Sequence, residues 1–217
     1  MTGDIGAFLC RLVRLDPAGL VRLRVAGQWC AVWGRVPWNV LVSRTVAASD
    51  VGVADADDVT VRAADWLAAG AGEVVGLERL DARWRTPLPG GRVRTLETLP
   101  SSELRRLGEA AARTLRETEA GGVGGRAVGA RALRDALLDH VAIVVTVNDG
   151  PDDGAPGIDI PQRLVQAVAR MGFLGTGDEP TRVIQSGRWI GLAAPFGVAW
   201  WRRPGELSVI PVPAARG

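Results

Sequence analysis

Apolar residues alternate with arginines along residues 20–26 (LVRLRVA), the period of two that a half-buried β-strand shows. A tight turn at Ala26-Gly27 follows, and the apolar pattern returns between Trp29 and Trp33. Pro37 then separates this run from a third extended segment that begins at Val40. Three short strands joined by tight turns predict an antiparallel meander.

Helical periods and a further alternation complete the first hundred residues. Residues 4–15 and 61–70 repeat apolar positions every three or four residues, which predicts a short helix in each. Residues 77–88 and 92–99 alternate around a Pro-Gly-Gly turn, which predicts a hairpin. We therefore expect residues 1–100 to form an antiparallel β module with one or two helices.

Three amphipathic runs follow. The first covers residues 101–121 and ends at two glycines. The second begins at residue 130, and its apolar face predicts a helix that continues through the run VAIVV to Val144. The third covers residues 161–171, with Gly172 placed as the C′ residue that ends it.

The chain ends in β-rich runs around two turn signals, Ser186-Gly187 and Pro195-Phe196-Gly197. These predict a terminal hairpin or a three-stranded sheet. The expected fold class is therefore α+β, with residues 101–217 forming a helical module of about three helices followed by a β-hairpin. Helices followed by a hairpin also describe a winged helix.

Composition narrows the classes of function. The chain has 217 residues, of which 47% are hydrophobic, and all 26 cationic residues are arginine. Arginines exceed acids by only one in each half, so neither half is a basic domain of the kind that non-specific phosphate binding needs.

The N-terminus has no secretory apolar region, and no segment approaches the ~18 apolar residues of a membrane helix. We expect a soluble cytoplasmic protein without a membrane partner.

Signals for catalysis, metals or cofactors are weak. Cys10 and Cys30 lie far apart and His140 is the only histidine, so no metal-ligand spacing occurs. A Walker A loop is excluded because the chain has no Lys. The pattern Gly122-x-Gly124-x-x-Ala127 follows a helix rather than a strand, which favours a flexible joint over a dinucleotide site. The acidic loop 148–157 lacks the ligand register of a calcium loop. We predict no catalytic residue, metal or cofactor.

Tryptophan is over-represented, with eight residues against no tyrosine. Three of them, Trp29, Trp33 and Trp38, fall within ten residues. Such a row can stack bases or sugars. Our preferred interpretation is that Trp29 and Trp33 fill the core against the helix that carries Trp66.

Three stretches carry a resemblance to a known family: VWGRVPWNVLVSRTV near the start, GVGGRAVGARALRDALLDH, and IPQRLVQAVARMGFLG. The chain resembles an uncharacterised family of two-module proteins of high-GC actinobacteria. The resemblance implies a cytoplasmic bacterial protein of two modules and carries no activity to transfer.

These observations leave a non-catalytic interaction or regulatory protein, docking on a protein partner or on itself, as the leading interpretation. The alternative is a nucleic-acid-binding protein, and an enzyme of unrecognised class is a second alternative. In the nucleic-acid interpretation the helix at 161–171 reads bases from an exposed row and the terminal hairpin contacts phosphates. The residues assigned to this surface are Gln162, Arg163, Gln166, Arg170, Arg188, Arg202 and Arg203. A long linker before this helix and the near-neutral charge weigh against it.

Overall fold

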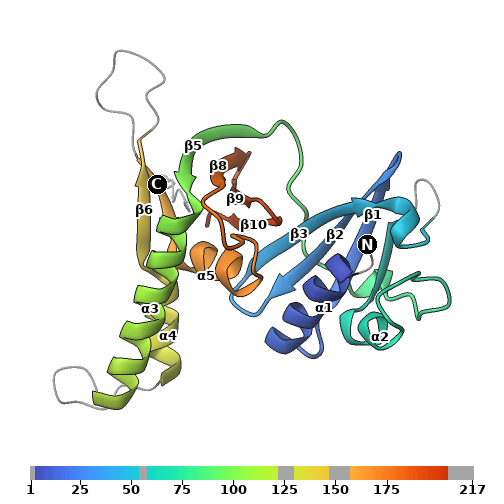
Figure 1. Cartoon of the computed structure of the whole chain (residues 1–217), viewed down its shortest axis with the longest axis horizontal. Helices are drawn as coiled ribbons and strands as arrows, with labels where there is room; N and C mark the ends of the chain where they lie inside the picture. The colour runs from blue at the N-terminus through green and yellow to red at the C-terminus, as the bar shows by residue number, and fades with distance from the viewer. Residues whose placement is uncertain (1–2, 54–57, 122–129, 147–156, 205–217) are drawn as a thin grey trace, which may run out of the picture.

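A single antiparallel sheet of eight strands runs through both halves of the chain (Figure 1). The computed structural model describes residues 3–53, 58–121, 130–146 and 157–204. The strand order is β4-β1-β2-β3-β10-β9-β8-β5, and β6 and β7 form a separate two-stranded ribbon. The strands are β1 (Leu20–Ala26), β2 (Trp29–Val36), β3 (Val40–Ala47), β4 (Asp58–Arg62), β5 (Arg94–Pro100), β6 (Val141–Val145), β7 (Ile158–Pro161), β8 (Pro180–Ser186), β9 (Trp189–Ala194) and β10 (Gly197–Arg202). The helices are α1 (Gly3–Leu15), α2 (Ala63–Ala68), α3 (Ser101–Gly121), α4 (Ala130–Asp139) and α5 (Gln162–Arg170), with 3-10 turns η1 (Ala48–Asp50) and η2 (Asp81–Arg83).

The predicted N-terminal meander is confirmed. β1, β2 and β3 pair in sequence order, and Gly27 takes the positive φ of 59° that the β1–β2 turn requires. The alternate residues Val21, Leu23 and Val32 point to the face that α1 covers, and each is fully buried. At Gly34 an added Cβ would lie 2.6 Å from the Leu12 side chain, so helix and sheet approach closely there.

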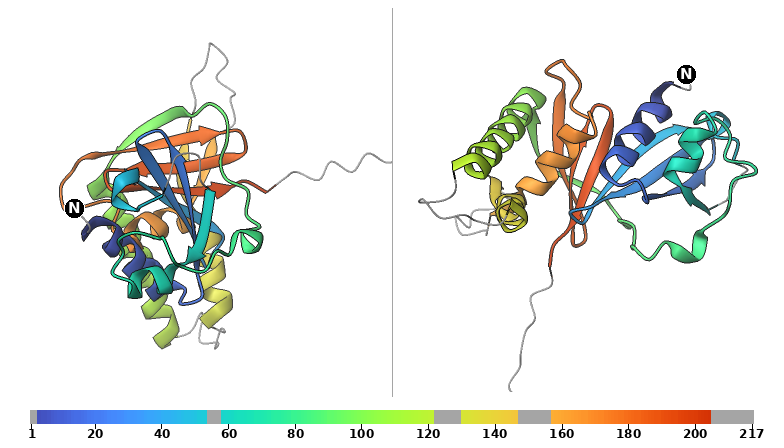
Figure 2. Two further views of the ribbon diagram at one scale, coloured as in Figure 1. Left: turned by 90° about the vertical axis from the view of Figure 1, so that its right-hand side faces the viewer. Right: turned by 90° about the horizontal axis from the view of Figure 1, so that it is seen from below.

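The predicted hairpin around residues 89–91 is wrong. Of its two arms only β5 is a strand, and it pairs with β8 rather than with residues 77–88. Residues 84–88 instead pass along the face of the sheet opposite α1, as the right-hand view of Figure 2 shows, with Trp84 and Leu88 packed onto that face. The apolar residues that alternate here are therefore buried against the existing sheet and not within a new one.

The expected C-terminal helical module with a winged-helix hairpin is also wrong. The terminal strands β8, β9 and β10 do form, but β10 pairs with β3 and continues the N-terminal sheet. Backbone hydrogen bonds between strands far apart in sequence leave no trace in local periodicity, so this pairing was not predicted. We call the β3–β10 boundary the seam.

The helices of the second half pack on the same side as α1. α5 lies on the C-terminal strands, with Leu164, Val165 and Val168 fully buried. α3 packs on α5, and α3 and α4 run side by side away from the sheet as a helical arm (Figure 1). None of the described helices is long and apolar enough to cross a membrane.

Helix α4 ends earlier than predicted. Val141 and Val144 belong to β6, which pairs with β7, and do not continue the helix. The run VAIVV is rich in β-branched residues, which favour a pleated strand over a helix. The predicted end of α5 is confirmed, because Gly172 has φ 66° and the Phe173 N–H donates to the carbonyl of Val168.

Each edge of the large sheet has backbone groups that are already bonded or missing. On β4, Thr60 donates its N–H to Asp81 (2.6 Å) and accepts from the N–H of Leu80 (2.7 Å), while Arg79 donates to the carbonyl of Asp58. On β5, Thr98 donates its N–H to the carboxylate of Glu97 (2.7 Å). Pro100, at the end of that strand, has no N–H to offer.

Candidate docking groove at the seam

A reciprocal pair of hydrogen bonds joins the two halves of the chain at the seam. The Trp38 Nε1–H donates to the carbonyl of Arg163 (3.1 Å), and the Arg163 Nη1–H donates to the carbonyl of Trp38 (2.8 Å). Trp38 lies in the turn between β2 and β3, where Asn39 has φ 61°, and Arg163 lies in the first turn of α5. Arg163 also pairs with Asp139 at the end of α4. Its guanidinium therefore serves mainly to lock α5 and α4 to the first half.

Two adjoining hollows lie beside this contact, at the ends of the central strands. One of about 520 Å³ is lined by residues of β2, β3, β9 and β10 and by Arg85. The other, of about 450 Å³, continues along the 83–86 segment and shares Arg35, Arg85 and Thr86 with the first. We call the pair the seam groove and define it by Arg35, Arg83, Arg85, Trp189, Trp201 and Arg202.

The seam groove is strongly positive. Five arginines line the two hollows against two aspartates, a formal excess of three. Asp139 is already paired with Arg163, and Asp16 accepts the N–H of Ala18. Arg83, Arg85 and Arg202 are exposed, and their side chains have no hydrogen-bonded or ionic partner among the described residues. Since the whole chain has a net charge of only +2, the positive charge is concentrated here.

The tryptophans of the groove form its floor. Trp189 is only 9% exposed, Trp201 is half-buried, and the Trp84 Nε1–H donates to the carbonyl of Thr86. Rings that are buried against the sheet support a ligand from below and leave little open face for base stacking.

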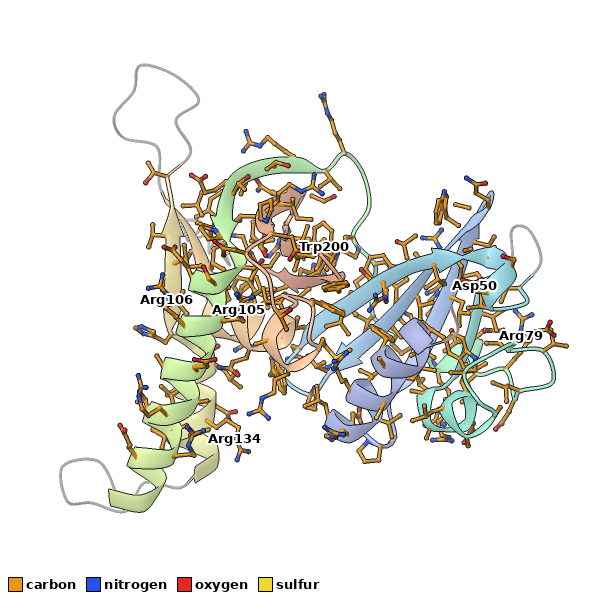
Figure 3. All side chains as sticks on the ribbon, in the orientation of Figure 1. Asp50, Arg79, Arg105, Arg106, Arg134 and Trp200 are labelled. Atoms are coloured by element: carbon orange, nitrogen blue, oxygen red, sulfur yellow. The ribbon has the colours of Figure 1, made fainter. Side chains whose placement is uncertain are left out.

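The prediction for the N-terminal tryptophans is wrong. Trp29 is 53% exposed, and Trp33 packs with Trp189 and Trp200 on the face opposite Trp66. Trp200 lies near the centre of the sheet (Figure 3), over Gly191, where an added Cβ would come within 2.8 Å of the ring.

The exposed Gln/Arg row expected on α5 does not exist. Gln162 is 5% exposed, and Gln162 and Gln166 donate to the carbonyls of Leu107 and Gly108 on α3. Arg170 is exposed on the same helix, at a hollow that Gln162 and Gln166 also line. These glutamines join two helices, since their amides are used by backbone acceptors, and offer no donor row to a major groove.

The structure brings some of the terminal arginines into contact with other residues assigned to nucleic acid. Arg188 donates to the carbonyl of Arg203, and Arg202 lines the seam groove with Arg163. Of the residues assigned to nucleic acid, the structure thus joins Arg188 to Arg203, places Arg163 and Arg202 in the seam groove, and places Gln162, Gln166 and Arg170 around another hollow. Whether any of them binds nucleic acid stays a prediction.

Sequence reasoning missed Arg35, Arg83 and Arg85. The stretch RWRTP at residues 83–87 interleaves arginine with tryptophan, a pattern that indicates an anion-binding surface. The predicted hairpin placed this stretch in one of its arms, and no ligand surface was expected there. Arg35 was not predicted either, because the other residues of the groove are distant from it in sequence.

The described residues contain no group of three or more His, Cys, Asp or Glu side chains that could hold a metal ion. His140 is exposed at the end of α4. Cys30 is buried, and burial raises the pKa of its thiol to about 11. The pattern Gly122 to Ala127 and most of the acidic loop 148–157 lie outside the described residues.

Two family models cover nearly the whole chain. Residues 1–86 match Domain of unknown function DUF8010, and residues 88–206 match Domain of unknown function DUF8185. The chain belongs to the DUF8185 family. The DUF8185 region contributes β5 to β10, and the DUF8010 match contributes the remaining strands of the sheet. No curated protein sequence matches this DUF8185 protein.

Solved structures show the fold of the DUF8185 protein. The DNA polymerase III subunit beta from Pseudomonas aeruginosa matches with a TM-score of 0.55 at 15% identity, covering 95% of this chain and 64% of that chain. The DNA polymerase sliding clamp from Bacillus subtilis matches with a TM-score of 0.56 at 12% identity, covering 97% and 66%. The sliding clamp from Bartonella birtlesii, solved bound to griselimycin, matches with a TM-score of 0.56 at 15% identity, covering 93% and 63%. The chain therefore has a sliding-clamp fold and spans about two thirds of the length of these clamps.

Proposed function

We propose that the protein is a non-catalytic docking protein and that its seam groove receives an acidic segment of a protein partner in the cytoplasm. The observation that carries the proposal is the charge of the groove: exposed arginines without partners among the described residues stand above a floor of buried tryptophan. Guanidinium groups bind carboxylates in a planar, two-pronged geometry. The tryptophan floor offers an apolar surface to a ligand side chain that lies between two acidic residues.

The scaffold supports a binding role. The similar solved proteins are described as sliding clamps, and one of them was solved with a bound ligand. An acidic peptide fits the groove better than a nucleic acid, because base stacking needs exposed ring faces and Trp189 is almost wholly buried.

The proposal is tested by selecting 12-residue peptides from a display library on the full chain. We expect enriched peptides to carry two or more acids beside one apolar residue. Their affinity should fall about tenfold or more in Arg85→Glu and Arg202→Glu, because each change replaces an attraction by a repulsion. Arg116→Glu is the matched control, since Arg116 is exposed on α3 away from the groove.

Selection of neutral peptides, or equal binding to the Arg85→Glu and wild-type proteins, would contradict the proposal. A labelled single-stranded oligonucleotide, dT20, tests the alternative in the same assay. Tight dT20 binding that Arg202→Glu abolishes and that weakens steeply with salt would favour the nucleic-acid interpretation instead.

A further inference from the structure

A second hollow lies on the helix side of the molecule, between the helical arm and the body. Its volume is about 420 Å³, within the ~300–1,000 Å³ of small-molecule sites. The end of α1 and the turn at Trp38 form one wall, and α3, α4 and α5 form the others. We call it the arm hollow and define it by Trp38, Leu115, Leu137, Leu138, Gln166 and Arg170.

The apolar surface of the arm hollow is only partly used by the fold. Leu115, Leu137 and Leu138 are half-buried and belong to neither cluster of core residues. Helix α4 has 10 residues, and a helix of that length depends on packing of its apolar face. A ligand that covers these leucines would therefore stabilise the arm as well as bury its own apolar surface.

Among the described residues that line the arm hollow, every polar side chain is neutral or positive. Arg134 and Arg170 are the two charged ones in that set, and Arg134 lies on the arm in Figure 3. The amides of Gln162 and Gln166 already donate to α3 carbonyls. Arg170 is exposed and has no ion-pair partner among the described residues.

We propose that the arm hollow binds a small amphipathic anion, a linear acyl carboxylate. Its chain lies on Trp38, Leu115 and Leu137, and its carboxylate pairs with the guanidinium of Arg170. The charge of the rim disfavours a second copy of the chain as the occupant. A two-fold contact over the hollow would bring Arg170 of the two copies together, with no carboxylate among the described lining residues to offset the repulsion.

Decanoate below its micelle concentration is the probe, titrated into the full chain by calorimetry. We expect saturable binding of one decanoate per chain. Affinity should fall about fourfold for each methylene removed toward hexanoate, because the chain length sets the buried apolar area. Decanol should bind more weakly than decanoate, because it lacks the charge that pairs with Arg170.

Two variants and one control locate the site. Arg170→Gln should weaken decanoate about tenfold or more while leaving decanol unchanged, because a charged hydrogen bond is lost. Leu137→Asn should weaken both ligands, with helix content checked by circular dichroism. Arg116→Gln should alter neither.

Several results would overturn the proposal. These are the absence of saturation by decanoate, equal affinity for decanol, or an equal loss of affinity in Arg116→Gln and Arg170→Gln. Sedimentation that shows a dimer dispersed by Leu137→Asn would also overturn it, because a second copy would then occupy the hollow.

Discussion

The two thiols of the chain lie in opposite environments. Cys10 is exposed on α1, whereas Cys30 is buried in β2 with a pKa of about 11. We predict that Ellman's reagent at pH 8 modifies one thiol rapidly in the native protein and the second only on unfolding, because a buried thiol is both shielded and protonated. Cys10→Ser should remove the rapid phase. Two rapid thiols in the native protein would show that Cys30 is accessible.

Arg22 and Asp58 form a two-pronged ion pair between β1 and β4, with both N–O distances 2.6 Å. The hydrogen bond from Arg22 holds the pKa of Asp58 below its ordinary value of 3.8. A lowered pKa contributes stability above the ordinary value, and that contribution is lost as pH falls through the folded value. The Asp58 side chain is 37% exposed, which limits the contribution through solvent screening.

We therefore expect Asp58→Asn to lower the free energy of unfolding by about 0.5–1 kcal/mol at pH 7. The difference from wild type should shrink as pH falls below 3.8, measured by urea unfolding at each pH. A difference that grows on acidification would rule out the assigned pKa direction. Asp65→Asn serves as a comparison, because Asp65 is exposed and lies 3.4 Å from Arg62. Its effect on the free energy of unfolding shows what a weaker ion pair contributes.

At the scale of elements, Gly108 sets how closely α3 approaches α5. An added Cβ would lie 3.5 Å from the Cβ of Ala169, which is ordinary contact. Gly108→Ala should therefore raise the free energy of unfolding by about 0.5–1 kcal/mol, because alanine favours a helix interior. Gly108→Leu should lower it by about 1–3 kcal/mol, because the larger side chain forces the helices apart. Thermal unfolding of both variants tests whether alanine stabilises the protein and leucine destabilises it. Destabilisation by alanine would mean that α3 and α5 cannot move apart enough to accept the added methyl group.

Local periodicity predicted the elements better than it predicted their partners. The meander of β1 to β3, the helices α1, α3 and α5, and the Gly172 cap follow from patterns within a few residues. The pairings of β10 with β3 and of β5 with β8 depend on residues far apart in sequence, and no local pattern reports them. The seam groove was missed for the same reason, since Arg35, Arg85 and Arg202 converge only through the β3–β10 pairing.

At the scale of the whole molecule, the Trp38–Arg163 contact couples the two halves. Arg163→Ala should lower the free energy of unfolding by about 2–3 kcal/mol, because it removes charged hydrogen bonds to Trp38 and Asp139 from a side chain that is 14% exposed. Arg170→Ala, about two helical turns further along α5 and exposed, should change it by no more than about 0.5 kcal/mol. Urea unfolding measures both. Equal effects would show that Arg163 is dispensable to the seam.

The partly occupied edges of the sheet limit where a strand of another molecule can pair with this protein. Along β4 the outward backbone groups of Thr60 are taken by Leu80 and Asp81, and along β5 Thr98 and Pro100 offer no free N–H. A strand from another molecule finds little backbone to pair with at these positions, so growth of a cross-β aggregate from the folded state is blocked there. Concentrated solutions of the native protein should therefore form no fibrils that bind thioflavin. The variant Asp81→Ala frees the Thr60 N–H, so fibril growth should begin at that position of β4.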